Sequence, residues 1–140
     1  MEKKIGLWID HEKAFIVKLT GGKESRSVIF SDVEPRIRPH GGFEIISEKK
    51  VERRRKGHLR SWYREVIGAV SGADRIFIFG PGAAKMELLS EMDDFREVSN
   101  KVVGMEPADN MSENQVAAKV RVFFDSEKGS VPPYRRAPGA

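Results

Sequence analysis

The chain has 140 residues, no cysteine and a formal net charge of +4. A chain of this length can bury a sizeable core in one domain, and the lack of cysteine excludes disulfides and thiolate metal sites. The apolar runs are far shorter than the ~20 residues of a transmembrane helix. Asp10, His11 and Glu12 interrupt the apolar N-terminal segment, which excludes a signal peptide. We therefore expect a soluble, cytoplasmic protein without membrane partners.

Three short strands are predicted at the start of the chain. They cover residues 5–9, 14–19 and 26–30, and Asp10-His11-Glu12 and Gly21-Gly22 form the turns between them. Residues 31–50 contain two prolines, two adjacent glycines and many charges, which predicts a long, exposed basic loop.

Helices and strands alternate after this loop. Leu59, Trp62, Tyr63, Val66, Ile67 and Val70 form one apolar face of a helix that starts near residue 51 and stops near Gly72. Of the adjacent pair Trp62 and Tyr63, we expect one to face the core and the other its edge. Residues 75–79 and 101–105 have the β-branched, aromatic and aliphatic composition of buried strands.

Two further helices are predicted in the second half of the chain. The inward-facing residues of the first are Ala84, Leu88, Leu89, Met92 and Phe95. Ser112 and Gln115 have the spacing of a capping box, which predicts the start of the last helix. The inward-facing residues of this last helix are Val116, Val120, Phe123 and Phe124.

The order β-β-β-α-β-α-β-α predicts an α/β fold with a mixed five-stranded sheet and about three helices. We expect one domain over residues 1–125. Residues 126–140 contain three prolines and two glycines, which predicts a flexible tail.

Charge is distributed unevenly along the chain. Residues 35–64 hold ten of the 25 lysines and arginines but three of the 21 acidic residues, so this segment carries +7 and the rest −3. Such a concentration is typical of a polyanion-binding surface, and RNA is the polyanion we expect. Five cations at a spacing of three or four form one stripe on the predicted helix. They are Lys50, Arg53, Lys56, Arg60 and Arg64.

The order of elements and several short motifs resemble a known family. Four segments resemble the central domain of eukaryotic and archaeal peptide-chain release factors and of Pelota. They are the basic loop with the tip His40-Gly41-Gly42-Phe43, the basic helix over 49–64, RIFIFGPGAAK over 75–85 and NKVVGM over 100–105. Single-domain bacterial relatives, the translational machinery proteins, share patterns such as Trp8-Ile9-Asp10-His11. The resemblance covers roughly residues 4–125 and implies a ribonuclease H-like fold.

The resemblance also implies a function in translation without catalysis. Release factors place a Gln after the two glycines, where it helps to admit water to the ester, whereas this chain has Phe43 followed by Glu44. A Phe side chain cannot hydrogen-bond water or an oxyanion. The decoding and partner-binding domains of the release factors have no counterpart here. Binding without hydrolysis, as in Pelota, is therefore expected rather than stop-codon release.

The leading hypothesis is an RNA-binding module that associates with the ribosome or with tRNA. Its RNA partner would be ribosomal RNA or tRNA. Its predicted RNA-contacting residues are Arg36, Arg38, His40, Gly41, Gly42, Phe43, Lys49, Lys50, Arg53, Arg54, Lys56, Arg60 and Arg64. Gly41-Gly42 is either an ordinary turn or a tip that approaches RNA closely, and Phe43 either stacks on a base or folds back onto the domain. The alternatives are an RNA-directed hydrolase, either a ribonuclease or an aminoacyl- or peptidyl-tRNA esterase, and a protein-interaction module.

Other candidate sites favour structural interpretations. Asp10 ends the first strand, where ribonuclease H-like nucleases keep a metal ligand, but Glu48, Asp74 and Asp109 show no spacing that would complete a two-metal site. Asp10 is therefore expected to cap a turn. Gly80-Pro81-Gly82 with Lys85 is expected to be a structural turn rather than an anion site. His11, His40 and His58 lack ligand spacing, so no metal or cofactor is predicted.

Overall fold

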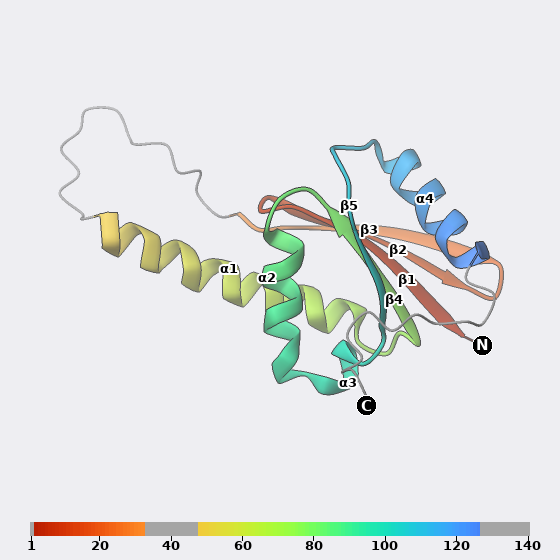
Figure 1. Ribbon diagram of the computed structural model, residues 1–140, viewed down its shortest axis with the longest axis horizontal. Coiled ribbons are helices and arrows are strands. Elements are labelled where there is room, and N and C mark those ends of the chain that lie inside the picture. Colours follow the sequence, from red (N-terminus) through yellow and green to blue (C-terminus); the bar gives the residue numbers. More distant parts are fainter. Residues whose placement is uncertain (1, 33–47, 127–140) are drawn as a thin grey trace.

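In a computed structural model, the chain forms a five-stranded sheet with helices on both faces (Figure 1). The structure describes residues 2–32 and 48–126. The strands are β1 (Lys3–Ile9), β2 (Lys13–Thr20), β3 (Lys23–Phe30), β4 (Arg75–Gly80) and β5 (Val102–Pro107). The helices are α1 (Glu48–Val70), α2 (Ala84–Glu91), α3 (Arg96–Ser99) and α4 (Glu113–Ser126), with a 3₁₀ turn, η1 (Met92–Asp94), after α2.

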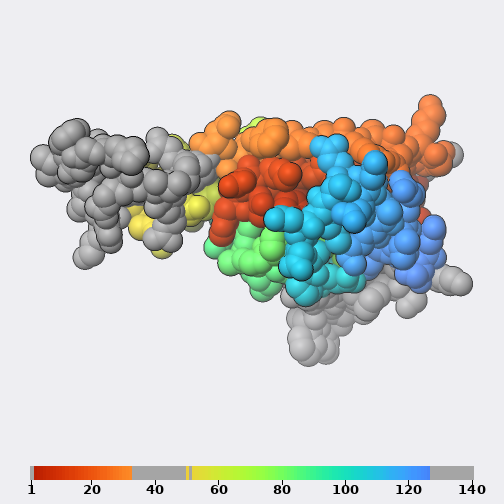
Figure 2. All heavy atoms as spheres, turned by 90° about the horizontal axis from the view of Figure 1, so that it is seen from above, coloured from red at the N-terminus to blue at the C-terminus, as the bar shows by residue number. Residues whose placement is uncertain are grey.

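The strand order is β3-β2-β1-β4-β5. β1, β2 and β3 pair antiparallel, whereas β4 and β5 run parallel to β1. Figure 2 shows β3, in orange, along one border of the body. The structure confirms the α/β fold with a mixed five-stranded sheet that the sequence predicts, with four α-helices in place of about three.

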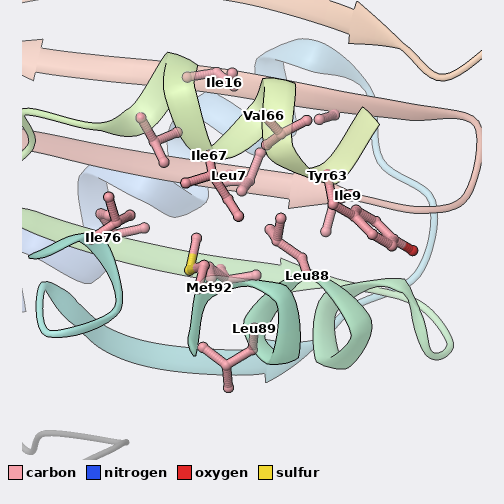
Figure 3. Packing of buried hydrophobic residues seen from close by; sticks show 14 of the residues in the cluster. Leu7, Ile9, Ile16, Tyr63, Val66, Ile67, Ile76, Leu88, Leu89 and Met92 are labelled. Atoms are coloured by element: carbon pink, nitrogen blue, oxygen red, sulfur yellow. The ribbon is translucent and has the colours of Figure 1, made fainter. Parts of the chain in front are cut away.

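Both faces of the sheet are buried, which explains the nearly continuous apolar runs in β1 and β4. Leu7, Ile9 and Ile16 belong to the core between the sheet and the helices α1 and α2. Figure 3 shows side chains of α1 and α2 converging on those of the strands. On the other face, aromatic side chains of the sheet, including Phe77 and Phe79, pack against α4.

Gly6 lets α4 lie close to the sheet. A Cβ at this position would lie within 2.6 Å of Val120 Cγ1, which is closer than real side chains approach. Phe123 of α4 stacks on Phe77 with ring centroids 3.9 Å apart. The small residue on β1 therefore sets the distance between α4 and the sheet.

Most predicted boundaries agree with the structure to within two residues, and three differ by more. β3, predicted over residues 26–30, begins at Lys23. The capping box is present, because Ser112 Oγ accepts the Gln115 N–H and Gln115 Oε1 accepts the Ser112 N–H. The helix predicted from residue 51 begins instead at Glu48. The second predicted helix is broken at Phe95, whose φ of −130° and ψ of 71° are not helical, so η1 and α3 replace its last part.

Within the described ranges, no helix has the length and apolarity to cross a membrane.

Candidate nucleic-acid interface

The apolar face of α1 ends at Leu59, and the helix continues for three turns beyond it. Leu59, Trp62 and Val70 are buried against the sheet, whereas toward the N-terminus Glu52, Arg55 and Lys56 replace the apolar residues. Residues 48–58, called the overhang below, span ~16 Å at 1.5 Å per residue. Figure 1 shows the N-terminal part of α1 reaching past the sheet. A charged surface is thereby presented away from the body.

Three cations of the overhang have no partner in the described part of the chain. Arg53, Arg54 and Lys56 are exposed, and none of them forms a hydrogen bond or ion pair with residues 2–32 or 48–126. Lys50 is also exposed. Unpaired guanidinium and ammonium groups on a projecting helix are suited to contact phosphates, since binding then breaks no existing ion pair.

Arg60 and Arg64, lower in the predicted stripe, have partners within the protein. Arg64 Nε lies 2.9 Å from Glu91 Oε1 and Arg64 Nη2 lies 3.1 Å from Asp94 Oδ2. Arg60 Nε lies 3.5 Å from the same Glu91 oxygen, and the Arg64 guanidinium lies 5.3 Å from the Phe95 ring centroid. These two arginines connect α1 to α2 and η1, so they differ from Arg53 and Lys56 of the same stripe, which have no partner among the described residues.

A polar network fixes the place where α1 leaves the body. The Tyr63 hydroxyl donates to Glu87 Oε1 at 2.6 Å, and His11 Nε2 lies 3.0 Å from the same oxygen. Arg55 is half-buried near this group, and its Nε has no hydrogen-bond partner in the described part of the chain. The β1–β2 turn, α1 and α2 are therefore joined at one carboxylate.

The network shifts two ionisation equilibria. Burial raises the pKa of Glu87, but hydrogen bonds from Tyr63 and His11 and the charges of His11 and Arg55 lower it by more, so it falls below its ordinary value of 4.5. Burial, followed by the hydrogen bond to Glu87, raises the pKa of the Tyr63 hydroxyl. Glu87 is consequently charged and Tyr63 neutral near pH 7, which is the pairing that the hydrogen bond requires.

The sequence reasoning missed this network. Trp62 and Tyr63 are both buried, at 3% and 4% exposure, so the expectation that one lies at the edge of the core is wrong. Both rings fit because each polar atom has a partner: Trp62 Nε1 donates to the Ile29 carbonyl at 3.3 Å, and Tyr63 donates to Glu87. A buried tyrosine hydroxyl needs a hydrogen-bond partner. The position of Tyr63 on the apolar face of the predicted helix was therefore the signal in the sequence for a polar contact there.

Asp10 is a turn residue, as predicted. Its Oδ1 accepts the N–H groups of Glu12 at 2.8 Å and Lys13 at 2.9 Å. Asp74 Oδ2 accepts the Lys3 N–H, at the opposite end of β1 from Asp10 and therefore ~20 Å away along the strand. In the described part of the chain, no group of three or more His, Cys, Asp or Glu side chains could hold a metal.

The Gly80-Pro81-Gly82 turn has a structural explanation. Gly80 has a φ of 149°, and a Cβ there would lie 3.1 Å from Ile9 N and closer still to the Ile9 carbonyl oxygen. Lys85 Nζ donates to the Gly82 carbonyl at 2.7 Å, so its ammonium group is engaged within the turn.

The remaining predicted contacts fall partly outside the described residues. Lys49 lies in the first turn of α1. The predicted RNA-contacting residues that lie outside the described residues are Arg36, Arg38, His40, Gly41, Gly42 and Phe43. Their assignment to the RNA interface remains a prediction.

Comparison with known proteins connects this fold to translation factors. No protein-family model and no curated protein sequence matches the chain. An archaeal translation termination factor matches with 12% identity and a TM-score of 0.53 over 90% of this chain and 40% of that one. The Pelota protein of Thermoplasma acidophilum matches with 18% identity and a TM-score of 0.54 over 92% and 34%. The chain shares its fold with part of both proteins. The resemblance inferred from the sequence is confirmed at the level of fold, and the chain spans 34–40% of the length of these two relatives.

Proposed function

We propose that this protein is a non-catalytic, cytoplasmic RNA-binding module that acts in translation or ribosome rescue. It associates with the ribosome or tRNA and contacts RNA through the basic segment 36–64. The observation that carries the proposal is the overhang of α1, on which Arg53, Arg54 and Lys56 are exposed and have no partner in the described part of the chain.

The placement of these cations is unfavourable for the isolated helix. Lys49 and Lys50 lie in the first turn, where the helix dipole disfavours positive charge. Lys50 and Arg54 are four residues apart and Arg53 and Lys56 three apart, which is the spacing at which like charges repel by a few tenths of a kcal/mol per pair. A bound polyanion relieves both effects, because each phosphate neutralises charge near the helix N-terminus.

The fold supports the assignment to translation. The two solved structures described above are, by name, a translation termination factor and a Pelota protein. Catalysis is disfavoured, because Asp10 is occupied with two backbone N–H groups and Asp74 lies at the other end of β1. A ribonuclease of the two-metal class needs several carboxylates converging on the ions.

Co-sedimentation with ribosomes tests the proposal. The variant Arg53→Gln/Arg54→Gln/Lys56→Gln removes three positive charges from the overhang, and we expect most of the bound fraction to be lost. The matched control replaces three exposed lysines on the body, Lys18, Lys23 and Lys101, with Gln, and it should sediment like the parent.

Two results would contradict this function. The first is equal sedimentation of the two triple variants, because net charge alone would then govern binding. The second is a bound fraction that survives complete ribonuclease digestion and follows an acidic polypeptide, which would support the protein-interaction alternative.

A further inference from the structure

The outer side of β3 is an open edge of the sheet. β3 is the first strand in the order β3-β2-β1-β4-β5, and Figure 2 shows it along one border of the body. The Ser31 N–H donates to the Glu12 carbonyl at 2.8 Å, and residues of an antiparallel pair bond in alternation, so the odd-numbered residues of β3 bond to β2. The even-numbered residues therefore direct their N–H and C=O groups outward, where these groups have no hydrogen-bond partner in residues 2–32 or 48–126. The outward residues are Glu24, Arg26, Val28 and Phe30.

The two edges of the sheet differ in how well they resist a further strand. β5, at the other edge, is six residues long, has a shift in its register with β4 and ends in Pro107, and each of these features opposes strand addition. β3 is eight residues long, pairs with β2 residue by residue and contains no proline. Its charged residues, Lys23, Glu24 and Arg26, all lie in its first half, so residues 27–30 lack the charges that usually protect an edge.

The unprotected end of β3 is apolar and accessible. Val28 and Phe30 lie on the face of the sheet that α4 covers, and Phe30 is 60% exposed. Ile29 lies on the other face, where it is half-buried beside Trp62 of α1. An exposed apolar edge with open backbone groups is a template for pairing with another strand.

The apolar end of β3 is complementary to a second copy of itself. In an antiparallel pairing centred on Ile29, Val28 lies opposite Phe30 of the second copy, and Ile29 lies opposite its own counterpart. Val28 and Phe30 are both outward residues, so they can exchange backbone hydrogen bonds, and aromatic and β-branched side chains stabilise such pairs. At the end of the paired stretch, Arg26 comes beside Asp32 of the second copy, whose carboxylate has no partner in the described part of the chain.

Other registers match less well. Moving the centre of the pairing back by one residue brings Glu24 beside Asp32, and two carboxylates repel. Moving it back by two residues places Arg26 opposite Val28 and Glu24 opposite Phe30, so charged side chains meet apolar ones. Moving it back by four residues leaves the exposed ring of Phe30 outside the pairing. The distribution of charged and apolar residues therefore favours the first register.

We propose that two copies of this protein associate through antiparallel pairing of their β3 strands, centred on Ile29, which joins the two sheets into one. This association goes beyond RNA binding and does not require it. α1 extends past the end of the sheet at which β3 stops (Figure 1), so the antiparallel pairing directs the two overhangs in opposite directions. The paired stretch is short, and we expect a Kd on the order of 10 µM.

A symmetric disulfide tests the register. The chain has no cysteine, so a single introduced thiol can cross-link only with its own counterpart. Position 29 faces itself as a non-hydrogen-bonded pair with Cα atoms ~4.5 Å apart, a distance that a disulfide spans, so Ile29→Cys should form a covalent dimer under mild oxidation. Ser25→Cys, exposed on the same face of β3, is the matched control. Its two copies lie ~27 Å apart in this register, so it should cross-link at least about tenfold more slowly.

Sedimentation equilibrium of the protein without introduced cysteine measures the association itself. Phe30→Lys places a charge at the apolar end of the edge, as natural edge strands do, and should weaken dimerisation at least about tenfold. The fold should tolerate this change, because the Phe30 side chain is mostly exposed. Met86→Lys makes the same change in charge at a site 50% exposed on α2, and it should leave the Kd unchanged.

The outcomes decide between this dimer and its alternatives. A protein that stays monomeric about twentyfold above the expected Kd overturns the proposal, and a β3 edge that instead binds an extended peptide of another protein gives this result. A dimer that Phe30→Lys does not weaken, or equal cross-linking of the two cysteine variants, also overturns it, because another surface or register would then join the copies. A β3 dimer that binds no RNA leaves this inference intact and contradicts the function proposed above.

Discussion

Glu87 is the residue at which α1, α2 and the β1–β2 turn meet. It lies in α2, accepts the Tyr63 hydroxyl of α1, and lies within hydrogen-bond distance of His11 in the β1–β2 turn. Its side chain is 46% exposed, so solvent screens part of each interaction. The carboxylate stabilises the native state only while it is ionised.

Replacing Glu87 should therefore give a pH-dependent loss of stability. The pKa of Glu87 is lowered on folding, so its contribution is fully present above its unfolded value of 4.5 and is lost as the pH falls through the lower folded value. We expect Glu87→Gln to cost about 1 kcal/mol at pH 7, after allowing for screening. Urea unfolding at several pH values checks this. A difference from the parent that stays constant from pH 7 to pH 3 would contradict it.

Asp10 gives a second test at this scale, because it separates a turn residue from a catalytic one. Asn retains the acceptor oxygen used by the Glu12 and Lys13 N–H groups, so Asp10→Asn should cost less than about 1 kcal/mol, and Asp10→Ala should cost more. Neither variant should change a cleavage activity, since none is expected in the parent. Mg²⁺- or Mn²⁺-dependent RNA cleavage that Asp10→Asn abolishes would support a nuclease instead.

α1 is a 23-residue helix whose C-terminal half packs on the sheet and whose N-terminal half extends past it. The half from Leu59 to Val70 is anchored by its apolar face and by the hydrogen bond from Tyr63 to Glu87, whereas the overhang presents exposed cations such as Arg53 and Arg54. Within the anchored half, Arg60 and Arg64 pair with the acidic residues Glu91 and Asp94. In the proposed interface, these acids would compete with RNA phosphates for the two arginines and limit how far along the helix RNA is contacted.

Removing the competing acid should strengthen RNA binding. In Glu91→Gln, Arg60 loses its carboxylate partner and Arg64 loses one of its two. One or two more phosphates can then be neutralised, so the slope of log K against log salt should become steeper by about 1. The stability cost should stay below about 1 kcal/mol, because the Arg64 side chain is 44% exposed. Glu97→Gln is the control of equal charge. Equal effects of the two variants on the slope would show that only net charge matters.

The sequence predicted α1 well and its connections poorly. A spacing of three and four residues identified Leu59 to Val70 as the buried face, because this periodicity is a local property of the chain. The ion pairs of Arg64 and the partner of Tyr63 join residues 24 to 30 positions apart and depend on how α1 docks against α2.

In the whole molecule, the positive charge is concentrated in one segment, and the apolar core lies on the two faces of the sheet. The sheet buries apolar residues on both faces, whereas residues 35–64 carry +7 and the rest of the chain −3. The order of strands and helices was predictable because each apolar run is short and bounded by turn residues such as Gly21-Gly22 and Gly80-Pro81-Gly82. A body of slight negative charge repels RNA, so binding should be confined to the basic segment.

The salt dependence of RNA affinity tests this account most directly. If the basic segment neutralises ~4–6 phosphates of a single strand, a plot of log K against log salt should have a slope of about −3 to −4. The variant Arg53→Gln/Arg54→Gln/Lys56→Gln should have a slope shallower by about 2, and the Lys18→Gln/Lys23→Gln/Lys101→Gln control should keep the parent slope. A slope near zero in the parent, or the same slope in both triple variants, would contradict an RNA interface on the overhang of α1.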